Sequence, residues 1–292
     1  MTTQYYVPTR SYWPIMASIA LFMMAIGAGT LINELKQEGG SMGQWVLLAG
    51  FALLLVIVFA WFRNVIRESR AGLYSAQMDR SFRWGMSWFI FSEVMFFAAF
   101  FGALFYIRTF AVPWLGGEGG RGSSHLLWQG FSAQWPLLLN PDAARFPGPV
   151  EVISPWGIPL LNTLLLLSSS VTLTVAHKGL KSGARSQVTF WLALTIVLGT
   201  TFIGFQAKEY IHAYTELGLT LSSGIYGTTF FILTGFHGLH VTLGSIMLIV
   251  ILLRVLKGHF DAEQHFGFEA VSWYWHFVDV VWVGLFLFVY IL

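Results

Sequence analysis

One carboxyl group lies in the middle of an apolar segment, where an acidic side chain needs a partner or a function. Glu93 is the only charged residue in the run from Trp84 to Ile107. An ionisable side chain near the centre of a bilayer costs roughly 2.5 to 3.5 kcal/mol on insertion scales. At helical spacings of three, four and seven it shares a face with Phe89, Phe96, Phe97 and Phe100. The pattern predicts either a carboxyl that handles protons or a neutral glutamic acid hydrogen-bonded to a neighbouring helix.

A polar stripe runs along the last apolar segment of the chain. Its members recur at spacings of three and four residues: Glu269, Ser272, Trp273, His276 and Asp279. Lipid cannot satisfy polar groups, so this stripe must face another helix or subunit, or lie near a headgroup layer. We interpret it as structural, with hydrogen bonds between helices.

Three histidines invite a haem or metal interpretation, because imidazole is the usual ligand of both. His237 and His240 share a helical face, and His276 lies on the next apolar segment. A haem also needs a facing ligand across a wide pocket, which the sequence does not supply. Hydrogen-bonded packing is the favoured interpretation, helped by glycines that allow close helix approach, Gly235, Gly238 and Gly244.

Other chemistry-bearing patterns are missing from the sequence. The chain has no cysteine, so it cannot supply a thiolate to copper, zinc or an iron–sulfur cluster. It also lacks a glycine-rich phosphate loop, a His-Glu-x-x-His motif and an evident Ser/His/Asp arrangement. We predict no catalytic residue and no metal ligand in this chain.

A basic pair follows the second apolar segment. Arg63 and Arg67 are four residues apart, just after the interfacial Trp61. Arginine binds phosphate in a forked geometry, so the pair suits a lipid headgroup. The alternative is ordinary enrichment of positive charge on the inner side of a membrane.

The elements that carry these residues are apolar segments of membrane-spanning length. The chain of 292 residues is 56% hydrophobic and only 10% charged, with a mean hydropathy of +0.67, which excludes an ordinary water-soluble domain. A helix needs about 20 apolar residues to cross a bilayer. We predict an all-α integral membrane protein, one domain over residues 1–292, with seven transmembrane helices at about 15–32, 45–62, 84–107, 156–176, 188–207, 225–253 and 268–292.

The connections between these segments predict the orientation. The long connection 108–155 is rich in glycine and proline, so we expect an irregular outer loop. Eleven of the 16 Lys and Arg residues fall on the side of the N-terminus, which places the N-terminus in the cytoplasm or the mitochondrial matrix and the C-terminus outside. The net charge of +2 reflects this bias, and no nucleic-acid partner is expected.

Together these residues resemble subunit III of the haem–copper cytochrome c oxidases over nearly the whole chain. Several motifs occur in the family's order, at 61–69, 89–97, 159–163, 206–210, 226–231, 235–241 and 265–282. The sequence departs from the family at Gln264, where many members have the first histidine of a pair, and in the length of the loop 108–155.

The resemblance implies a subunit without redox centres in an aa3-type oxidase, with two helices splayed from five around a cleft filled by phospholipid. Haem a, haem a3 and copper belong to the partner subunits I and II, and cytochrome c is an indirect partner. The subunit supports proton uptake and protects subunit I from inactivation during turnover. Glu93 matches the family's intramembrane glutamate. Lipid-cleft and helix-contact motifs carry Trp61, Arg63, Arg67, Arg83, Arg254, His237, His240 and Glu269.

Two other classes of protein stay open at this point. An ion-coupled transporter would use Glu93, Asp279 and the histidines as a proton relay, but the sequence shows neither matching halves nor broken helices. The third subunit of a quinol oxidase has five helices, which the first two segments here argue against. The expected location is a bacterial inner membrane, with the mitochondrial inner membrane as the alternative.

Overall fold

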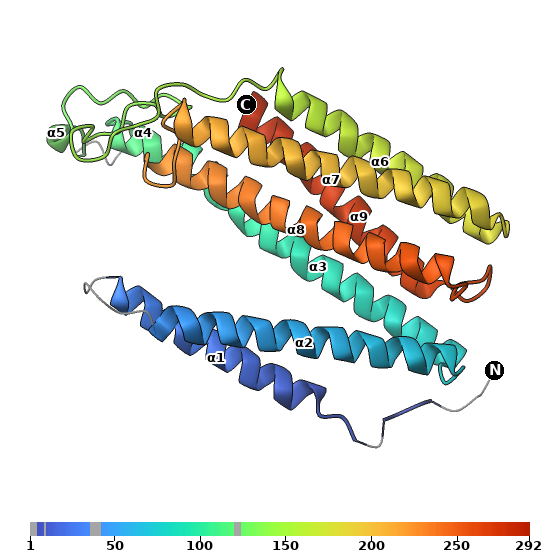
Figure 1. Cartoon of the computed structure of the whole chain (residues 1–292). Helices are drawn as coiled ribbons and strands as arrows, with labels where there is room; N and C mark the ends of the chain where they lie inside the picture. Colours follow the sequence, from blue (N-terminus) through green and yellow to red (C-terminus); the bar gives the residue numbers. More distant parts are fainter. Residues whose placement is uncertain (1–4, 9, 36–41, 120–123) are drawn as a thin grey trace. The chain divides into compact units, whose positions relative to one another are not determined.

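All regular secondary structure in the described part of the chain is helical. The structure is a computed structural model that describes residues 5–8, 10–35, 42–119 and 124–292. The regular elements are, in chain order, α1 Trp13–Glu34, α2 Met42–Arg70, α3 Ala76–Tyr106, a π-helix Ile107–Ala111, α4 Val112–Leu115, α5 Ser124–Leu127, α6 Ile158–Lys181, α7 Arg185–Thr215, α8 Ile225–Leu256, α9 Phe266–Leu285 and a π-helix Phe286–Ile291 (Figure 1).

In the part of the chain that the structure describes, seven helical spans are long and apolar enough to cross a membrane, as the sequence predicts. Most of them extend beyond the apolar runs, because a helix continues to satisfy its backbone after its side chains become polar. The third span continues without a break through the π-helix and α4 to Leu115. The outer connection therefore begins several residues later than position 108, and its residues 120–123 lie outside the described ranges.

By their contacts the helices form two compact units, Met1–Phe82 and Arg83–Leu292. The single membrane domain over residues 1–292 stays a prediction from the sequence. In the first unit, α1 and α2 pack closely along most of their length. Glycines make this approach possible. A Cβ added to Gly27 would meet the backbone of Leu47, and a Cβ added to Gly50 would lie 2.9 Å from the Met24 nitrogen.

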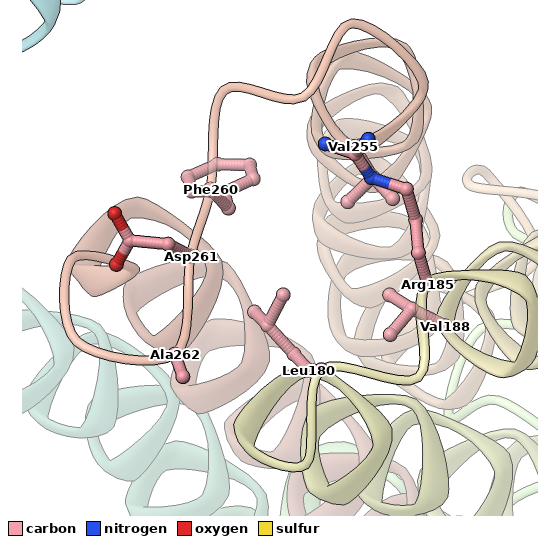
Figure 2. A pocket seen from close by; sticks show the side chains of 8 residues that line it. Leu180, Arg185, Val188, Val255, Phe260, Asp261 and Ala262 are labelled. Carbon is pink, nitrogen blue, oxygen red and sulfur yellow. The ribbon is translucent and has the colours of Figure 1, made fainter.

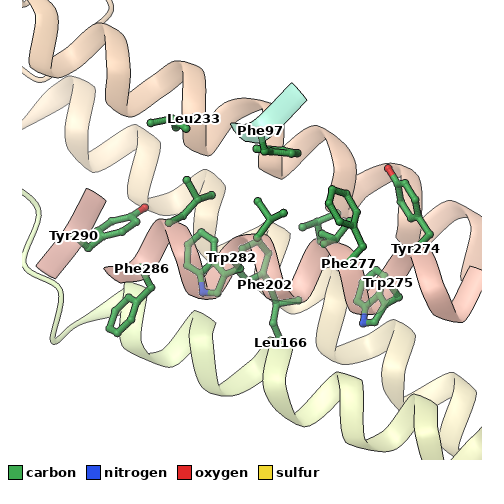
Figure 3. Close-up of a cluster of buried hydrophobic side chains, with 14 of the residues drawn as sticks. Phe97, Leu166, Phe202, Leu233, Tyr274, Trp275, Phe277, Trp282, Phe286 and Tyr290 are labelled. Carbon is green, nitrogen blue, oxygen red and sulfur yellow. The ribbon is translucent and has the colours of Figure 1, made fainter. Parts of the chain in front are cut away.

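In the second unit, α6 packs on α7, α7 on α8, α8 on α9, and α9 returns to α6 (Figure 1). The part of α3 that belongs to this unit joins through aromatic contacts: Phe96 lies edge-on to Phe236 of α8, at 5.1 Å between ring centroids, and Phe89 stacks on Tyr274 of α9. The buried core between these helices is rich in large aromatic side chains (Figure 3).

Trp275 of α9 joins three other helices in this core. Its indole is 1% exposed, and its Nε1 donates to the Ser169 hydroxyl of α6 at 2.9 Å. A Cβ on Gly199 of α7 would lie 2.5 Å from the Trp275 Cη2, and a Cβ on Gly244 of α8 would lie 2.9 Å from its Cε3. Of the three glycines expected to permit close packing in α8, Gly244 is thus the one in tight contact, whereas a Cβ on Gly238 would meet no atom within 4 Å.

Candidate functional site

The intramembrane carboxyl on α3 has a specific partner on α8. The Glu93 Oε2 lies 2.9 Å from the Nε2 of His240. The opposite ring nitrogen, Nδ1, lies 2.6 Å from the backbone carbonyl oxygen of Phe236. The side chains of Glu93 and His240 are 22% and 10% exposed, so both groups are largely removed from solvent.

This geometry fixes how protons are arranged in the pair. A carbonyl oxygen only accepts, so the Nδ1 of His240 carries a hydrogen. The remaining nitrogen then either accepts a hydrogen bond from a protonated Glu93 or, as an imidazolium, donates one to the Glu93 carboxylate. Both states hold one proton between the two groups and have no net charge, which is what a poorly solvated site favours.

Aromatic rings surround this pair, as the phenylalanine pattern on α3 predicts. The ring centroid of Phe97 lies 5.0 Å from that of His240, and the Phe96 centroid lies 6.0 Å from it. Phe100 stacks on Phe236 at 5.4 Å, and Tyr274 stacks on the histidine ring at 6.3 Å. The rings limit the access of water, which strengthens the hydrogen bond between the two side chains.

The neighbouring His237 belongs to the packed core. It is fully buried, and its Nε2 donates to the backbone carbonyl of Val278 on α9 at 3.1 Å. The ring has no exposed surface within this chain, and the lipid-binding role of His237 stays a prediction. The buried polar ring needs a hydrogen-bond partner, and the neighbouring helix supplies it.

The polar stripe on α9 meets different partners along its length. His276 Nδ1 lies 2.6 Å from the Ser170 hydroxyl of α6, and Glu269 Oε2 lies 2.5 Å from the Arg83 Nη1 of α3. Ser272 donates to the carbonyl of its own helix at Phe268. Asp279 is buried, with 6% of its surface exposed.

Glu269 also forms a cluster with two histidines. Its Oε1 lies 3.8 Å from His177 Nε2 and 3.9 Å from His265 Nε2. The ligand atoms of these three side chains lie within 4.8 Å of one another, and two imidazoles with one carboxylate are a donor set that zinc accepts. Arg83 supplies positive charge to the same carboxylate. The expected lack of a metal ligand in this chain stays a prediction.

The lipid-binding candidates of the first unit lie on the end of α2. Trp61, Arg63 and Arg67 are all exposed, and helical spacing puts the two arginines on one face. Within the described ranges neither arginine forms an ion pair. Both guanidinium groups are therefore available to a phosphate.

An acidic residue beside this pair is already engaged. Glu68 accepts hydrogen bonds from Asn64 Nδ2 and from the Tyr74 hydroxyl, both at 2.9 Å. Burial and this contact with Glu68 raise the pKa of Tyr74, which lies between α2 and α3. Glu68 is thus held by neutral donors and leaves the arginines unpaired.

Arg83 and Arg254, the two arginines of the second unit that are predicted to bind lipid, contact other side chains of this chain. Arg83 pairs with Glu269 and lies 5.3 Å from the centroid of the Phe266 ring. Arg254 lies 4.2 Å from the centroid of the Phe260 ring. Their lipid-binding role stays a prediction, and the structure assigns each of them a contact that stabilises the chain around α9.

Sequence reasoning missed one buried acidic residue. Glu209 of α7 is 1% exposed, and its Oε1 accepts from the Tyr290 hydroxyl at 2.7 Å and from Gln206 Nε2 at 3.0 Å. The apolar run was expected to end at residue 207, which put Glu209 outside the membrane helix. Because α7 continues to Thr215, this carboxyl lies well inside the helix, and the motif 206–210 was the available signal.

The described residues form seven apolar helices of membrane-spanning length, and polar contacts between helices hold the unit Arg83–Leu292 together. These features define an integral membrane protein that crosses the bilayer several times. The chain belongs to the cytochrome c oxidase subunit III family, whose model matches residues 3–118 and 128–292.

Curated relatives agree with this family. The chain is 40% identical to "Cytochrome c oxidase subunit 3" of Marchantia polymorpha over 281 residues, 96% of this chain and 93% of the relative. It is 39% identical to the protein of that name in Formosania lacustris over 287 residues, 98% of this chain and 96% of the relative. Lumbricus terrestris has a relative that is 40% identical, covering 96% of this chain and 94% of the relative. Membership of the family implies a place in an oxidase complex with other subunits.

Proposed function

We propose that this chain is the subunit without redox centres in an aa3-type cytochrome c oxidase, and that it supports proton uptake by subunit I and stabilises that subunit during turnover. The complex transfers electrons from cytochrome c to oxygen, with haem a, haem a3 and copper held by subunits I and II. The observation that carries the proposal is the Glu93–His240 hydrogen bond, a contact between helices in a segment where charge is costly.

The contacts of the histidines support the assignment of redox chemistry to other subunits. His237 is bonded to Val278, His240 to Glu93 and Phe236, and His276 to Ser170. Each ring is positioned by a neighbouring group of this chain. The side chains that invite a haem interpretation thus act as contacts between helices.

The proposed setting is a bacterial inner membrane, with the N-terminus in the cytoplasm and the C-terminus outside. The distribution of Lys and Arg supports this orientation, since 11 of the 16 lie on the side of the N-terminus. The mitochondrial inner membrane, with the N-terminus in the matrix, is the alternative.

Releasing this chain from the purified oxidase with mild detergent tests the proposal. We expect the haem absorbance and the copper to stay with the remaining subunits, proton uptake to slow several-fold, and activity to be lost after fewer turnovers. Adding the chain back should restore both properties. Haem or copper that leaves with this chain, or unchanged uptake and turnover lifetime after its removal, would contradict the proposal.

Phospholipid is the second proposed partner, bound by Arg63, Arg67 and Trp61. Arg67→Ala should reduce the number of phospholipids that remain on the complex after detergent washing, because the forked phosphate contact is lost. Mass spectrometry of the intact complex gives this number. Arg80→Ala is the matched control, since Arg80 is an exposed arginine of the same unit and its loss changes the charge equally. The site is rejected if the two variants retain as much lipid as the unmodified complex.

A further inference from the structure

A cavity of about 300 Å³ lies where α6 passes into α7 and α8 ends before α9. None of the site residues discussed above lines it. Figure 2 shows its lining, which consists of Leu180, Gly183, Arg185, Val188, Val255, Phe260, Asp261 and Ala262.

The walls of this cavity combine apolar and polar groups, and come from the ends of α6 to α8 and from the connection before α9. Val188 is fully buried, Val255 is 3% exposed and Leu180 is 8% exposed, so these side chains are fixed by the bundle. Phe260 lies in the connection after α8, and the Arg254 guanidinium stacks on its ring. The helical part of the lining is thus preformed, and it offers an apolar wall beside polar groups, as ligand sites do.

One cation, the guanidinium of Arg185, borders the cavity. Within the described part of the chain, Arg185 forms no ion pair. Its guanidinium lies against Gly258, so close that a Cβ at that position would clash with the Nη2. Glycine at position 258 therefore leaves room for the guanidinium at the rim.

The acidic residue in the lining does not neutralise this arginine. The Oδ1 of Asp261 accepts from the backbone N–H of Glu263 at 2.9 Å and from that of Gln264 at 2.5 Å. In Figure 2 the Asp261 carboxylate points away from Arg185. The charge of Arg185 is available to an anion that enters the cavity.

We propose that this cavity binds an acyl-chain lipid with an anionic headgroup, a carboxylate or a phosphate. The headgroup pairs with Arg185, and the first part of the chain lies against Val188 and Val255. The volume is at the lower end for ligand pockets, so the rest of the chain extends into the bilayer.

A photoactivatable fatty acid with a diazirine in its chain tests this site on the intact oxidase complex in lipid nanodiscs. We expect the label in peptides that contain Val188 or Phe260. Arg185→Gln should reduce labelling roughly tenfold, the size of one charge-assisted hydrogen bond. Ala262→Trp should reduce it as strongly by filling the cavity from an exposed loop, without changing the helix packing.

Two further variants separate this site from general effects. Asp261→Asn keeps the Oδ1 acceptor while it removes a negative charge, so labelling should increase. Arg67→Ala affects only the proposed phospholipid site on α2, and labelling should be unchanged. Wild-type labelling in both Arg185→Gln and Ala262→Trp, in complexes that assemble normally, overturns the proposal.

Competition identifies the ligand chemistry. Oleate and phosphatidylglycerol should each displace the probe, and the more effective competitor indicates whether a fatty acid or a phospholipid is the natural occupant. Methyl oleate, which has no charge, and inorganic phosphate, which has no chain, should be poor competitors. Displacement by inorganic phosphate as efficient as that by oleate would exclude an acyl-chain site, and equal displacement by methyl oleate would exclude the role of Arg185.

Discussion

Trp275→Ala is expected to destabilise the unit Arg83–Leu292 by about 3–5 kcal/mol, the usual cost of removing a large buried aromatic side chain. The indole fills the space between Gly199 and Gly244 and donates to Ser169. Loss of the indole leaves a single cavity that borders all three helices α6, α7 and α8. The free energy of unfolding of the full chain, measured by titration with a denaturing detergent, gives the effect.

A pair of substitutions tests whether this steric contact is the cause. Gly199→Ala should destabilise by roughly 1–3 kcal/mol through overpacking, because the new Cβ would lie 2.5 Å from the Trp275 Cη2. In a Trp275→Phe background that outer carbon is gone, and the same Gly199→Ala change should cost much less. Ser169→Ala removes only the hydrogen bond and should cost about 1 kcal/mol. An equal cost of Gly199→Ala in both backgrounds would show that the tryptophan contact is not responsible.

The fold could be predicted from the sequence because lipid leaves the backbone few options. Long apolar runs must be helices, and all seven runs are helical in the structure. The ends of the helices could not be predicted, since hydrophobicity reports where side chains meet lipid and not where the backbone stops being helical. For this reason α7 continues to Thr215 and the third span to Leu115, beyond the ends of their apolar runs.

The candidate site could be predicted only as a set of residues that need partners. The apolar surroundings of Glu93 indicate that it has a partner, but nothing in one sequence pairs it with a histidine 147 positions away. The same limit applies to His237 and His240, whose spacing in the sequence gives no sign that their surroundings differ. One is buried in the core and the other faces the acid on α3, because a small difference in helix rotation decides which neighbour each ring meets.

Glu93→Ala is expected to shorten the turnover lifetime of the oxidase several-fold, whereas Glu93→Gln should stay within about twofold of the unmodified enzyme. The His240 Nδ1 is committed to the Phe236 carbonyl, so a neutral ring presents a lone pair to residue 93. A glutamine amide can donate to that lone pair, as protonated glutamic acid does. Alanine leaves a largely buried acceptor without a partner, which costs about 1–3 kcal/mol and loosens α3 from α8.

The comparison separates packing from titration, because glutamine keeps the hydrogen bond but cannot change its charge. Proton uptake and turnover lifetime are measured in both variants, with normal haem spectra showing that subunit I is intact. Ser92→Ala is the control, since Ser92 lies on the same helix and its hydroxyl donates to the carbonyl of Phe89 in its own helix. If glutamine is as harmful as alanine, exchange of the proton between Glu93 and His240 is itself required. If both variants behave as the unmodified enzyme does, the pair has no part in proton uptake, and the stabilising role of this chain must come from other contacts.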